Sequence, residues 1–337
     1  MKNETTTMKH LKTLLTITAA TCALASSATA SIDIATSYVG NPNNPGATQW
    51  QIAGKGSVGY GYHVGTHEVT NNQYVSFLNA KAATDPHGLW NPQMGAIGYA
   101  NTAYILRTGS DGNYTYNVRT DINHLPLTNG NKPVNWVSFW DAARFTNWLT
   151  NGQGSGDTET GVYNLGGVTN PTEGTITRNA AAWGAGGVAI ANPDEWHKAA
   201  YYDPNLNGGE GGHWQLPGQT NDATNAWEWG QFGSNQTREV GLGLPSYYGT
   251  YDQGGNVAEW QDTGVGDSYV KGGYFGQDGT ASNAKNLIWS LQANELTYTG
   301  FRVTSLGTIP EPSSYAAMFG CLALTVAIIR RKGRRTL

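Results

Sequence analysis

The sequence predicts a mixed α/β (α+β), loop-rich fold, and three observations support this prediction. Glycine accounts for 45 of the 337 residues, well above the usual ~7%, so turns are expected to be frequent. Twelve Trp and 18 Tyr supply large side chains for a core. Three short segments carry helix start signals, and short strand-like runs lie between and after them, without a long amphipathic helix or a repeat of fixed period.

Each predicted helix begins at a residue that can cap its first turn. Residues 70–73 (TNNQ) form a capping-box pattern, and Ser138 with Asp141 forms a second. Asn192 precedes a proline and two acidic residues, which the first turn of a helix favours. Apolar residues at helical spacing follow the three starts: Tyr74, Phe77 and Leu78; Ala142, Phe145, Trp148 and Leu149; Trp196, Ala199 and Ala200.

The long central part of the chain shows no strong internal boundary, so residues 31–308 are expected to form one domain. Within it, residues 152–191 are rich in Gly, Thr and Asn. This composition predicts an insertion or a long hairpin.

Residues 1–30 have the features of a secretory signal peptide. Two lysines give a positive start, a mildly apolar run too short to span a membrane follows, and residues 28–30 (ATA) supply the small-residue cleavage pattern. The mature chain is therefore expected to begin at Ser31, in an exported protein. Cys22 leaves open a lipoprotein interpretation, although Thr21 before it makes a poor acylation site.

Residues 309–337 combine Pro310-Glu311-Pro312, an apolar run at 315–329 and a basic cluster at 330–335. As a helix the run would measure about 22 Å, short of the ~30 Å hydrocarbon core of a bilayer. One interpretation is a weak transmembrane helix whose basic end stays cytoplasmic and leaves the body outside. The three parts in this order also resemble a PEP-CTERM sorting signal. That resemblance implies a membrane peptidase of the exosortase kind as partner, and removal or exchange of the tail at the cell surface.

The body between the two ends is acidic and contains no cysteine. Eight of the 20 basic residues and two of the 24 acidic residues belong to the ends, which leaves 12 against 22 in residues 31–310, a net charge of −10. Such a balance argues against a nucleic-acid partner and suits bound cations. Cys22 and Cys321 both lie in the ends, so the mature domain has no disulfide, thiolate metal site or cysteine nucleophile.

Six sequence blocks stand in a fixed order along the body: GTHEVTN at 65–71, PVNWVS at 133–138, the helix start and helix at 192–202, YGTYDQGGNVAEW at 248–260, the glycine pair at 272–273, and GFR at 300–302. Together they resemble the formylglycine-generating enzyme (sulfatase-modifying factor) domain, a variant of the C-type lectin fold. The resemblance extends from about Val58 to Ser305. It implies helices packed around small antiparallel sheets, with much irregular structure.

The resemblance also implies which residues carry the family's oxidative chemistry. Family enzymes oxidise a sulfatase cysteine with two cysteines of their own, which bind copper shortly after the glycine pair. Counted from Gly273, those positions hold Gln277 and Ser282 here. An amide and a hydroxyl cannot supply the soft thiolate that copper(I) requires. We therefore expect neither copper binding nor this oxidation.

A calcium site is the second property that the resemblance implies. Hard oxygen donors, two carboxylates and glycines that turn carbonyls inward suit Ca²⁺. The alternative is that the first carboxylate caps a turn and the second accepts an internal hydrogen bond. The ligands carried over by position are the side chains of Asp252 and Glu259 and the carbonyls of Gly255 and Val257.

Two further metal sites have weaker support. A second family calcium site would begin at Asn225 and the Ala226 carbonyl, but its later ligands cannot be placed. His63 and His67 lie four residues apart, on one face if the segment is a strand. No third ligand is evident, and histidines that pack or lie at the surface are far commoner. A Gly-x-Ser-x-Gly elbow of a serine hydrolase is absent from the sequence.

These features predict an exported cell-surface or matrix protein with a non-catalytic, calcium-stabilised domain that binds a surface polysaccharide or a protein. Exposed Trp and Tyr could stack on sugars, although most Trp are expected in the core. The alternatives are an enzyme of the same superfamily with an iron or hydroxylase-type site, and a purely structural role. The groove beside residues 273–282 discriminates among them, since it is either open and polar or filled by Tyr274 and Phe275.

Overall fold

The structure, a computed structural model, describes residues 31–96, 104–120, 129–169, 176–224, 236–264 and 267–309. The chain divides into two units, one formed by Ile32–Glu311 and the other by the two terminal segments. The first unit contains every described residue except Ser31. The predicted signal peptide and the tail with Pro310, Glu311 and Pro312 lie outside the described residues. Within the described ranges, the helices are all too short or too polar to cross a membrane.

Three of the helices begin at the capping residues that the sequence predicts. The hydroxyl of Thr70 accepts a hydrogen bond from the Gln73 amide, Ser138 does so from Asp141, and Asn192 from Glu195. In each case the third residue returns a bond to the amide of the cap, so two otherwise unpaired donors are satisfied. The helices are α2 (Asn71–Lys81), α3 (Phe139–Thr150), α4 (Ala180–Gly184), α5 (Pro193–Tyr201) and α6 (Leu206–Gly209), with 3-10 turns η1 (Trp50–Ile52), η2 (Pro92–Gly95), η4 (Asn129–Asn131) and η5 (Gly279–Ser282).

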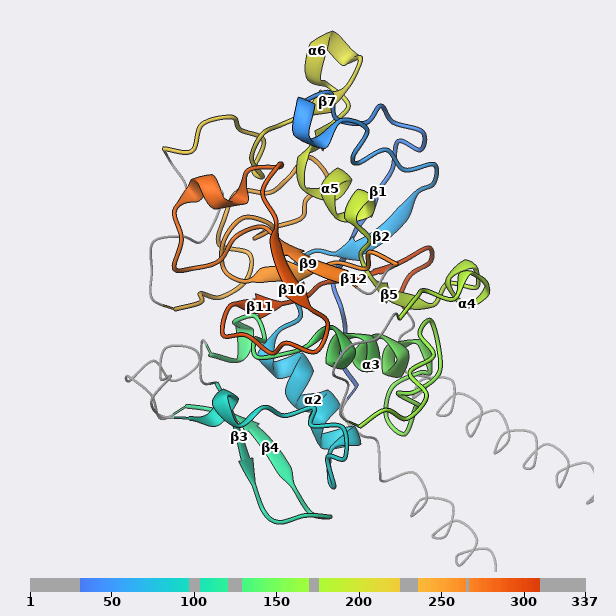
Figure 1. The fold of residues 1–337 in the computed structure, drawn as a ribbon, viewed down its shortest axis with the longest axis vertical. Coiled ribbons are helices and arrows are strands. Elements are labelled where there is room, and N and C mark those ends of the chain that lie inside the picture. The colour runs from blue at the N-terminus through green and yellow to red at the C-terminus, as the bar shows by residue number, and fades with distance from the viewer. Residues whose placement is uncertain are drawn as a thin grey trace, which may run out of the picture. The chain divides into compact units, whose positions relative to one another are not determined.

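The strands form two four-stranded sheets and two short pairs (Figure 1). One sheet has the order β1-β2-β12-β5 and is antiparallel throughout; the other has the order β10-β9-β8-β11, with β8 and β11 parallel. The predicted mixed α/β, loop-rich fold is confirmed. The strands are β1 (Thr36–Val39), β2 (Tyr62–Gly65), β3 (Ile105–Thr108), β4 (Thr115–Val118), β5 (Val188–Ile190), β6 (Tyr202–Asp203), β7 (Gly212–His213), β8 (Ala258–Trp260), β9 (Asp267–Lys271), β10 (Ile288–Leu291), β11 (Thr299–Gly300) and β12 (Val303–Ser305).

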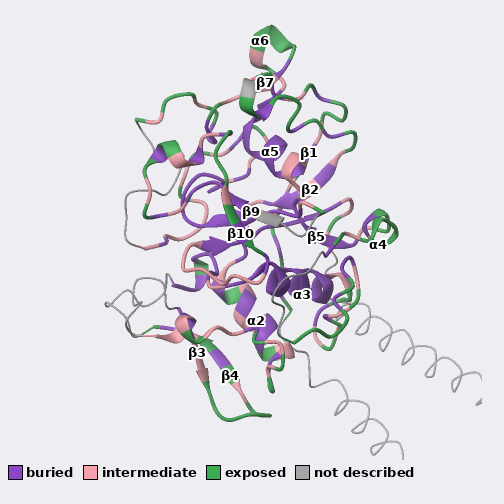
Figure 2. Cartoon of the chain, viewed as in Figure 1, coloured by how far each residue is buried: buried purple, intermediate pink, exposed green. Residues whose placement is uncertain are grey.

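Helix α3 lies at the centre of the core. All of its residues except Thr150 are buried, as the continuous purple of α3 in Figure 2 shows. The ring of Phe145 packs against Phe77 of α2, against Trp148, and against Phe301 between β11 and β12, with centroid distances of 5.4, 5.7 and 5.4 Å. One aromatic cluster therefore joins segments from both ends of the domain.

The segment 152–191 differs from the predicted hairpin. Among its described residues the strand is β5, and it pairs with the distant β12 rather than with a neighbour in sequence. The loop before it packs on α3 through Asn147, whose side chain donates to the carbonyls of Thr158 and Tyr163 and accepts from the Tyr163 amide. Three backbone groups held by one buried amide make this segment an insertion fixed to the core.

Candidate functional site

The residues expected to bind calcium lie on one buried loop that runs into β8. Asp252 and Asn256 have positive φ angles of 60° and 56°, and Gly255 has 83°, so the backbone curls tightly there. The amide of Gly255 donates to the Gly272 carbonyl at 2.8 Å, which ties this loop to the glycine pair. The carboxylate of Asp252 is buried and accepts a hydrogen bond from the Gly241 amide.

Glu259, the other expected ligand, forms a buried ion pair with Arg302. Both side chains are fully buried, and the guanidinium donates to both carboxylate oxygens at 2.6 Å. The indole of Trp196, on α5, donates to the same carboxylate at 2.7 Å. Arg302 also donates to the carbonyls of Gly65 and Tyr251 at 3.0 and 2.9 Å. This pair links four of the six sequence blocks.

A third carboxylate, that of Glu68, lies beside this pair and was not expected from the sequence. Its side chain is buried, and neither oxygen has a hydrogen-bond partner among the described residues. Burial, and next the negative charge of Asp252, raise the pKa of Glu68 well above its usual range, although Arg302 opposes the shift. The neighbouring His67 packs on Tyr251, and burial, followed by Arg302, lowers its pKa to about 4.

The net charge of the cluster formed by Glu68, Asp252, Glu259 and Arg302 would balance that of a divalent cation. When ionised, the carboxylates of Glu68, Asp252 and Glu259 exceed the single positive charge of Arg302 by two. The carboxylate of Glu68, buried without a donor, is costly unless it is protonated or paired with a cation. No three His, Cys, Asp or Glu side chains of the described ranges are grouped so that they alone could hold a metal ion. Backbone carbonyls would therefore have to supply part of any coordination shell.

The two weaker metal predictions have different outcomes. Asn225 and Ala226 lie outside the described residues. His63 and His67 both make packing contacts: the ring of His63 packs at a tilt of 54° against Tyr38, with the centroids 5.3 Å apart, and approaches the Thr36 hydroxyl at 3.4 Å. Their surroundings correspond to the packing alternative.

The two positions where the family's cysteines are expected hold structural side chains. The amide of Gln277 accepts a hydrogen bond from the Tyr274 backbone at 3.1 Å, and the hydroxyl of Ser282 donates to the Gly279 carbonyl at 3.0 Å. Phe275 is buried, and Tyr274 stacks on Tyr298 at 4.4 Å. These aromatic rings pack against the protein, and residues 273–282 do not line the pocket described next.

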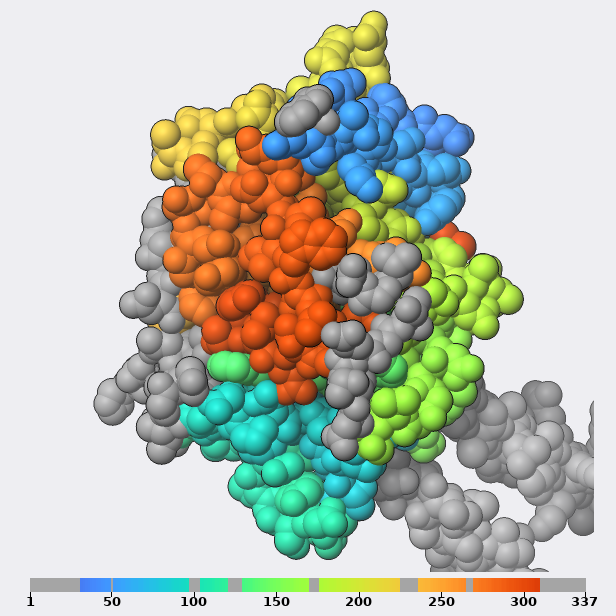
Figure 3. Space-filling view, viewed as in Figure 1, coloured from blue at the N-terminus to red at the C-terminus, as the bar shows by residue number. Residues whose placement is uncertain are grey.

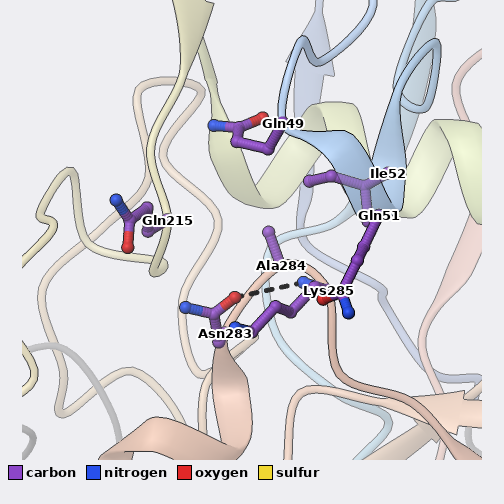
Figure 4. A pocket seen from close by; sticks show the side chains of 7 residues that line it. All are labelled: Gln49, Gln51, Ile52, Gln215, Asn283, Ala284 and Lys285. Atoms are coloured by element: carbon purple, nitrogen blue, oxygen red, sulfur yellow. Dashed lines mark hydrogen bonds between the residues drawn. The ribbon is translucent and has the colours of Figure 1, made fainter.

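A pocket of about 400 Å³ with a mixed polar and apolar lining begins at Asn283, and its walls come from three segments that are distant in sequence (Figure 4). One wall is formed by Gln49, Gln51 and Ile52, another by residues 283–285, and Gln215 completes the lining. The polar lining consists of four amides, from Gln49, Gln51, Gln215 and Asn283, and the ammonium of Lys285.

Backbone hydrogen bonds and a buried lysine hold the pocket in place. The amide of Ala284 donates to the Gln215 carbonyl at 2.8 Å, and Lys271 donates to the Ala284 carbonyl at 2.7 Å. Burial lowers the pKa of Lys271 to about 8. The Oε1 atom of Gln49 is buried without a hydrogen-bond partner among the described residues, which leaves an acceptor for a bound hydroxyl or amide.

Segment 267–305 forms the middle of one face of the molecule, orange to red in Figure 3. This segment contains β9, the positions Gln277 and Ser282 where the family's cysteines are expected, one wall of the pocket, and Arg302. No single stretch of sequence signals the pocket, because its walls come from three segments. Glu68 could have been found, since it stands inside the block at 65–71.

Comparison with known proteins agrees with this architecture. A sequence profile of the "Sulfatase-modifying factor enzyme 1-like domain" matches residues 39–305, most of the chain. The chain therefore belongs to the sulfatase-modifying factor enzyme 1-like family. Comparison with curated proteins finds no significant match.

Three solved structures are similar to this chain at low sequence identity. Treponema denticola variable protein 1 is similar with a TM-score of 0.53 and 18% identity, over 82% of this chain and 96% of that one. CarF is similar at 0.48 and 20% identity, over 82% and 99%. PvdO from Pseudomonas aeruginosa is similar at 0.45 and 14% identity, over 82% and 93%. The likeness to the first of these supports the fold and carries nothing about activity.

Proposed function

We propose that the protein is an exported, non-catalytic binding protein of the cell surface or extracellular matrix, stabilised by calcium. The observation that carries the proposal is a pocket that begins at Asn283, next in sequence to Ser282, and is lined by four amide side chains. Gln277 and Ser282, which replace the family's thiolates, do not line it and are held by internal hydrogen bonds. A pocket without a nucleophile or soft metal ligand can recognise a ligand but cannot perform the family's oxidation.

The lining favours an uncharged, hydroxyl-rich ligand such as a segment of a surface polysaccharide. Amide side chains combine donors and an acceptor, which matches hydroxyl groups that do the same. Part of this capacity is used within the protein, since Gln49 donates to the His213 carbonyl and Asn283 accepts from the Lys285 amide. The unpaired Oε1 of Gln49 adds an acceptor that water or a ligand hydroxyl would satisfy. Lys285 is exposed at the rim and can donate to further oxygens.

Binding should depend on Gln215 and Asn283. We expect the full chain to bind at least one member of a panel of neutral hexasaccharides (cello-, malto-, xylo- and N-acetylchito-oligosaccharides). Replacing both residues by alanine should weaken that binding roughly 5- to 100-fold, since each hydrogen bond contributes about 0.5–1.5 kcal/mol. The measurement is isothermal titration calorimetry. The matched control is Asn113→Ala, in the turn between β3 and β4 and outside the pocket. Failure of the wild type to bind any probe, or equal loss in the control, would contradict the proposed pocket.

The calcium ion would be held by Asp252 and the carbonyls of Gly255 and Val257. The charge of Glu259 is already shared with Arg302, and Glu68 adds negative charge to the same cluster. A bound cation would relieve the repulsion between Glu68 and Asp252 and fix the loop before β8. Its role there is structural.

Export and display follow from the two ends of the chain. Residues 1–30 would be removed on secretion, and an exosortase-type peptidase would recognise Pro310-Glu311-Pro312 and process the tail. In a host with the matching peptidase, we expect mature protein to lack the basic cluster at 330–335. A variant with alanines at 310–312 should accumulate in the membrane fraction. Mass spectrometry of displayed protein provides the test, and an intact tail on it would favour a plain membrane anchor instead.

A further inference from the structure

A second cavity, independent of the proposed polysaccharide pocket, lies at the start of α3. Its volume is about 400 Å³, and its lining includes Asp85, His87, Asp141, Arg144 and Glu295. The loop after β10 is held against α3 by a hydrogen bond of 2.9 Å from the Phe139 amide to the Gln292 carbonyl. The loop after α2 is joined to it by Asn91, which donates to Glu295.

The three carboxylates of this cavity use only part of their accepting capacity. Asp141 accepts from the Ser138 amide and hydroxyl, at 2.9 and 2.6 Å, through Oδ2 alone. Glu295 accepts from Asn91 through Oε2 alone. Within the described ranges, Asp141 Oδ1 and Glu295 Oε1 have no donor. Asp85 caps its own loop by accepting from the Leu89 and Trp90 amides.

The cavity is also short of positive charge. Arg144 is paired with Glu159 at 2.8 Å, and Arg107 lies 3.7 Å from Asp85. When ionised, the four carboxylates of Asp85, Asp141, Glu159 and Glu295 exceed these two guanidiniums by two charges. Protonated His87, 3.5 Å from Glu159, would reduce the excess to one. Burial, then Asp141 and Asp85, raise the pKa of Glu295 to about 8, and burial raises that of Asp141 to about 6. Protonation of either carboxyl would relieve this repulsion.

An unpaired donor provides a second, independent observation. Arg144 is completely buried, and its Nη1 atom has no hydrogen-bond partner in the part of the chain that the structure describes. A buried guanidinium nitrogen without an acceptor costs free energy that a ligand oxygen would recover. The cavity therefore offers two carboxylate oxygens to a cation and one N–H group to an oxygen beside it.

A metal ion does not fit these groups. Among the described residues, no three His, Cys, Asp or Glu side chains converge closely enough to coordinate one. The free donor of Arg144 would repel a metal but would pair with a hydroxyl group. The surplus negative charge also disfavours a zwitterion relative to a ligand with net positive charge.

We propose that this cavity binds the primary ammonium group of an amino alcohol, with Asp141 Oδ1 and Glu295 Oε1 accepting from the ammonium and Arg144 Nη1 donating to the neighbouring hydroxyl. Two kinds of ligand share this chemistry: a sugar amine, and a small free amino alcohol that keeps its hydroxyl group. D-Glucosamine and ethanolamine represent them as probes. N-Acetylglucosamine has the same ring without the charge and serves as the uncharged control.

Calorimetric titration of the full chain at pH 7 tests the proposal. We expect D-glucosamine to bind at least tenfold more tightly than N-acetylglucosamine. Glu295→Gln keeps the size of the side chain and should weaken glucosamine binding at least tenfold, whereas Asp222→Asn, an exposed carboxylate, should leave it unchanged. Asp85→Asn, which should also weaken binding, serves as the second variant if Glu295→Gln fails to fold by circular dichroism. Tighter binding of ethanolamine than of glucosamine would assign the site to a small free amino alcohol rather than a sugar, and would support the ammonium chemistry.

The pH dependence separates this role from a merely structural one. Because an ammonium ligand favours ionised Glu295, the affinity for glucosamine should rise between pH 5.5 and 7.5, by up to about tenfold per unit while the carboxyl is protonated. Asp85, His87, Asp141 and Arg144 also line this cavity, and Arg107 and Glu159 pair with Asp85 and Arg144. The same titration on Glu295→Gln therefore isolates Glu295 and should show a smaller rise. Equal affinities for glucosamine and N-acetylglucosamine, no binding of either amine, or an unchanged profile in Glu295→Gln would overturn the proposal.

Discussion

Replacing Arg302 with methionine is expected to lower the free energy of unfolding by about 3–5 kcal/mol, because it leaves a buried carboxylate without its partner. Arg302 is fully buried and donates to both oxygens of Glu259 and to the carbonyls of Gly65 and Tyr251. Methionine would fill much of the volume but supply none of these bonds.

Urea denaturation followed by Trp fluorescence measures this loss on the full chain. A control at the surface, Lys285→Met, should change the stability by no more than about 0.5 kcal/mol. The double variant Glu259→Leu with Arg302→Met removes both charges and should recover part of the loss, since two buried apolar residues avoid the desolvation cost. A loss below about 1 kcal/mol in Arg302→Met would show that the ion pair does not hold the four sequence blocks together.

Calcium is expected to raise the melting temperature by about 5–10 °C when present at a hundred times its dissociation constant. Such an excess adds about 2.7 kcal/mol of stability to a protein that binds the ion only when folded. Asp252→Asn should abolish the shift, because the amide removes one of the negative charges that attract the ion. Asp252 is a sharper test than Glu259, whose substitution would also break the pair with Arg302.

Differential scanning calorimetry with added calcium, and with chelator, provides the measurement. Asp278→Asn, an exposed carboxylate that caps η5, is the matched control and should retain the full shift. A chelator that leaves the wild-type transition unmoved, together with elemental analysis that finds no calcium, would rule out the site at Asp252.

Local signals predicted the helices well. Thr70, Ser138 and Asn192 are each followed by a residue that can return the capping hydrogen bond, so their helix starts depend on neighbours in sequence alone. The pairing of β5 with β12 could not be predicted in this way. Their partners lie more than 100 residues apart, and the strands are three residues long, too short for a clear alternation of apolar side chains.

For the candidate sites too, the parts formed by neighbours in sequence could be predicted, whereas the contacts between distant residues could not. Asp252 and Glu259 belong to one sequence block, so their shared loop could be predicted. The ion pair between Arg302 and Glu259 could not, because the two residues are 43 positions apart. The pocket beyond Ser282 and the acidic cavity at α3 each combine segments from several parts of the chain. Only the fold brings Gln49 to Asn283, or Asp85 to Glu295.

The central claim is that this domain binds without catalysing the oxidation of its family's thiol-bearing members. Incubation of the purified full chain with copper and a sulfatase-type cysteine peptide, followed by mass spectrometry, tests it most directly. We predict no conversion of the peptide cysteine to the aldehyde above a control with metal alone, because Gln277 and Ser282 offer no thiolate to hold copper and substrate sulfur together. Aldehyde formed in a time- and enzyme-dependent manner would contradict the claim and would require a catalytic site that uses other residues.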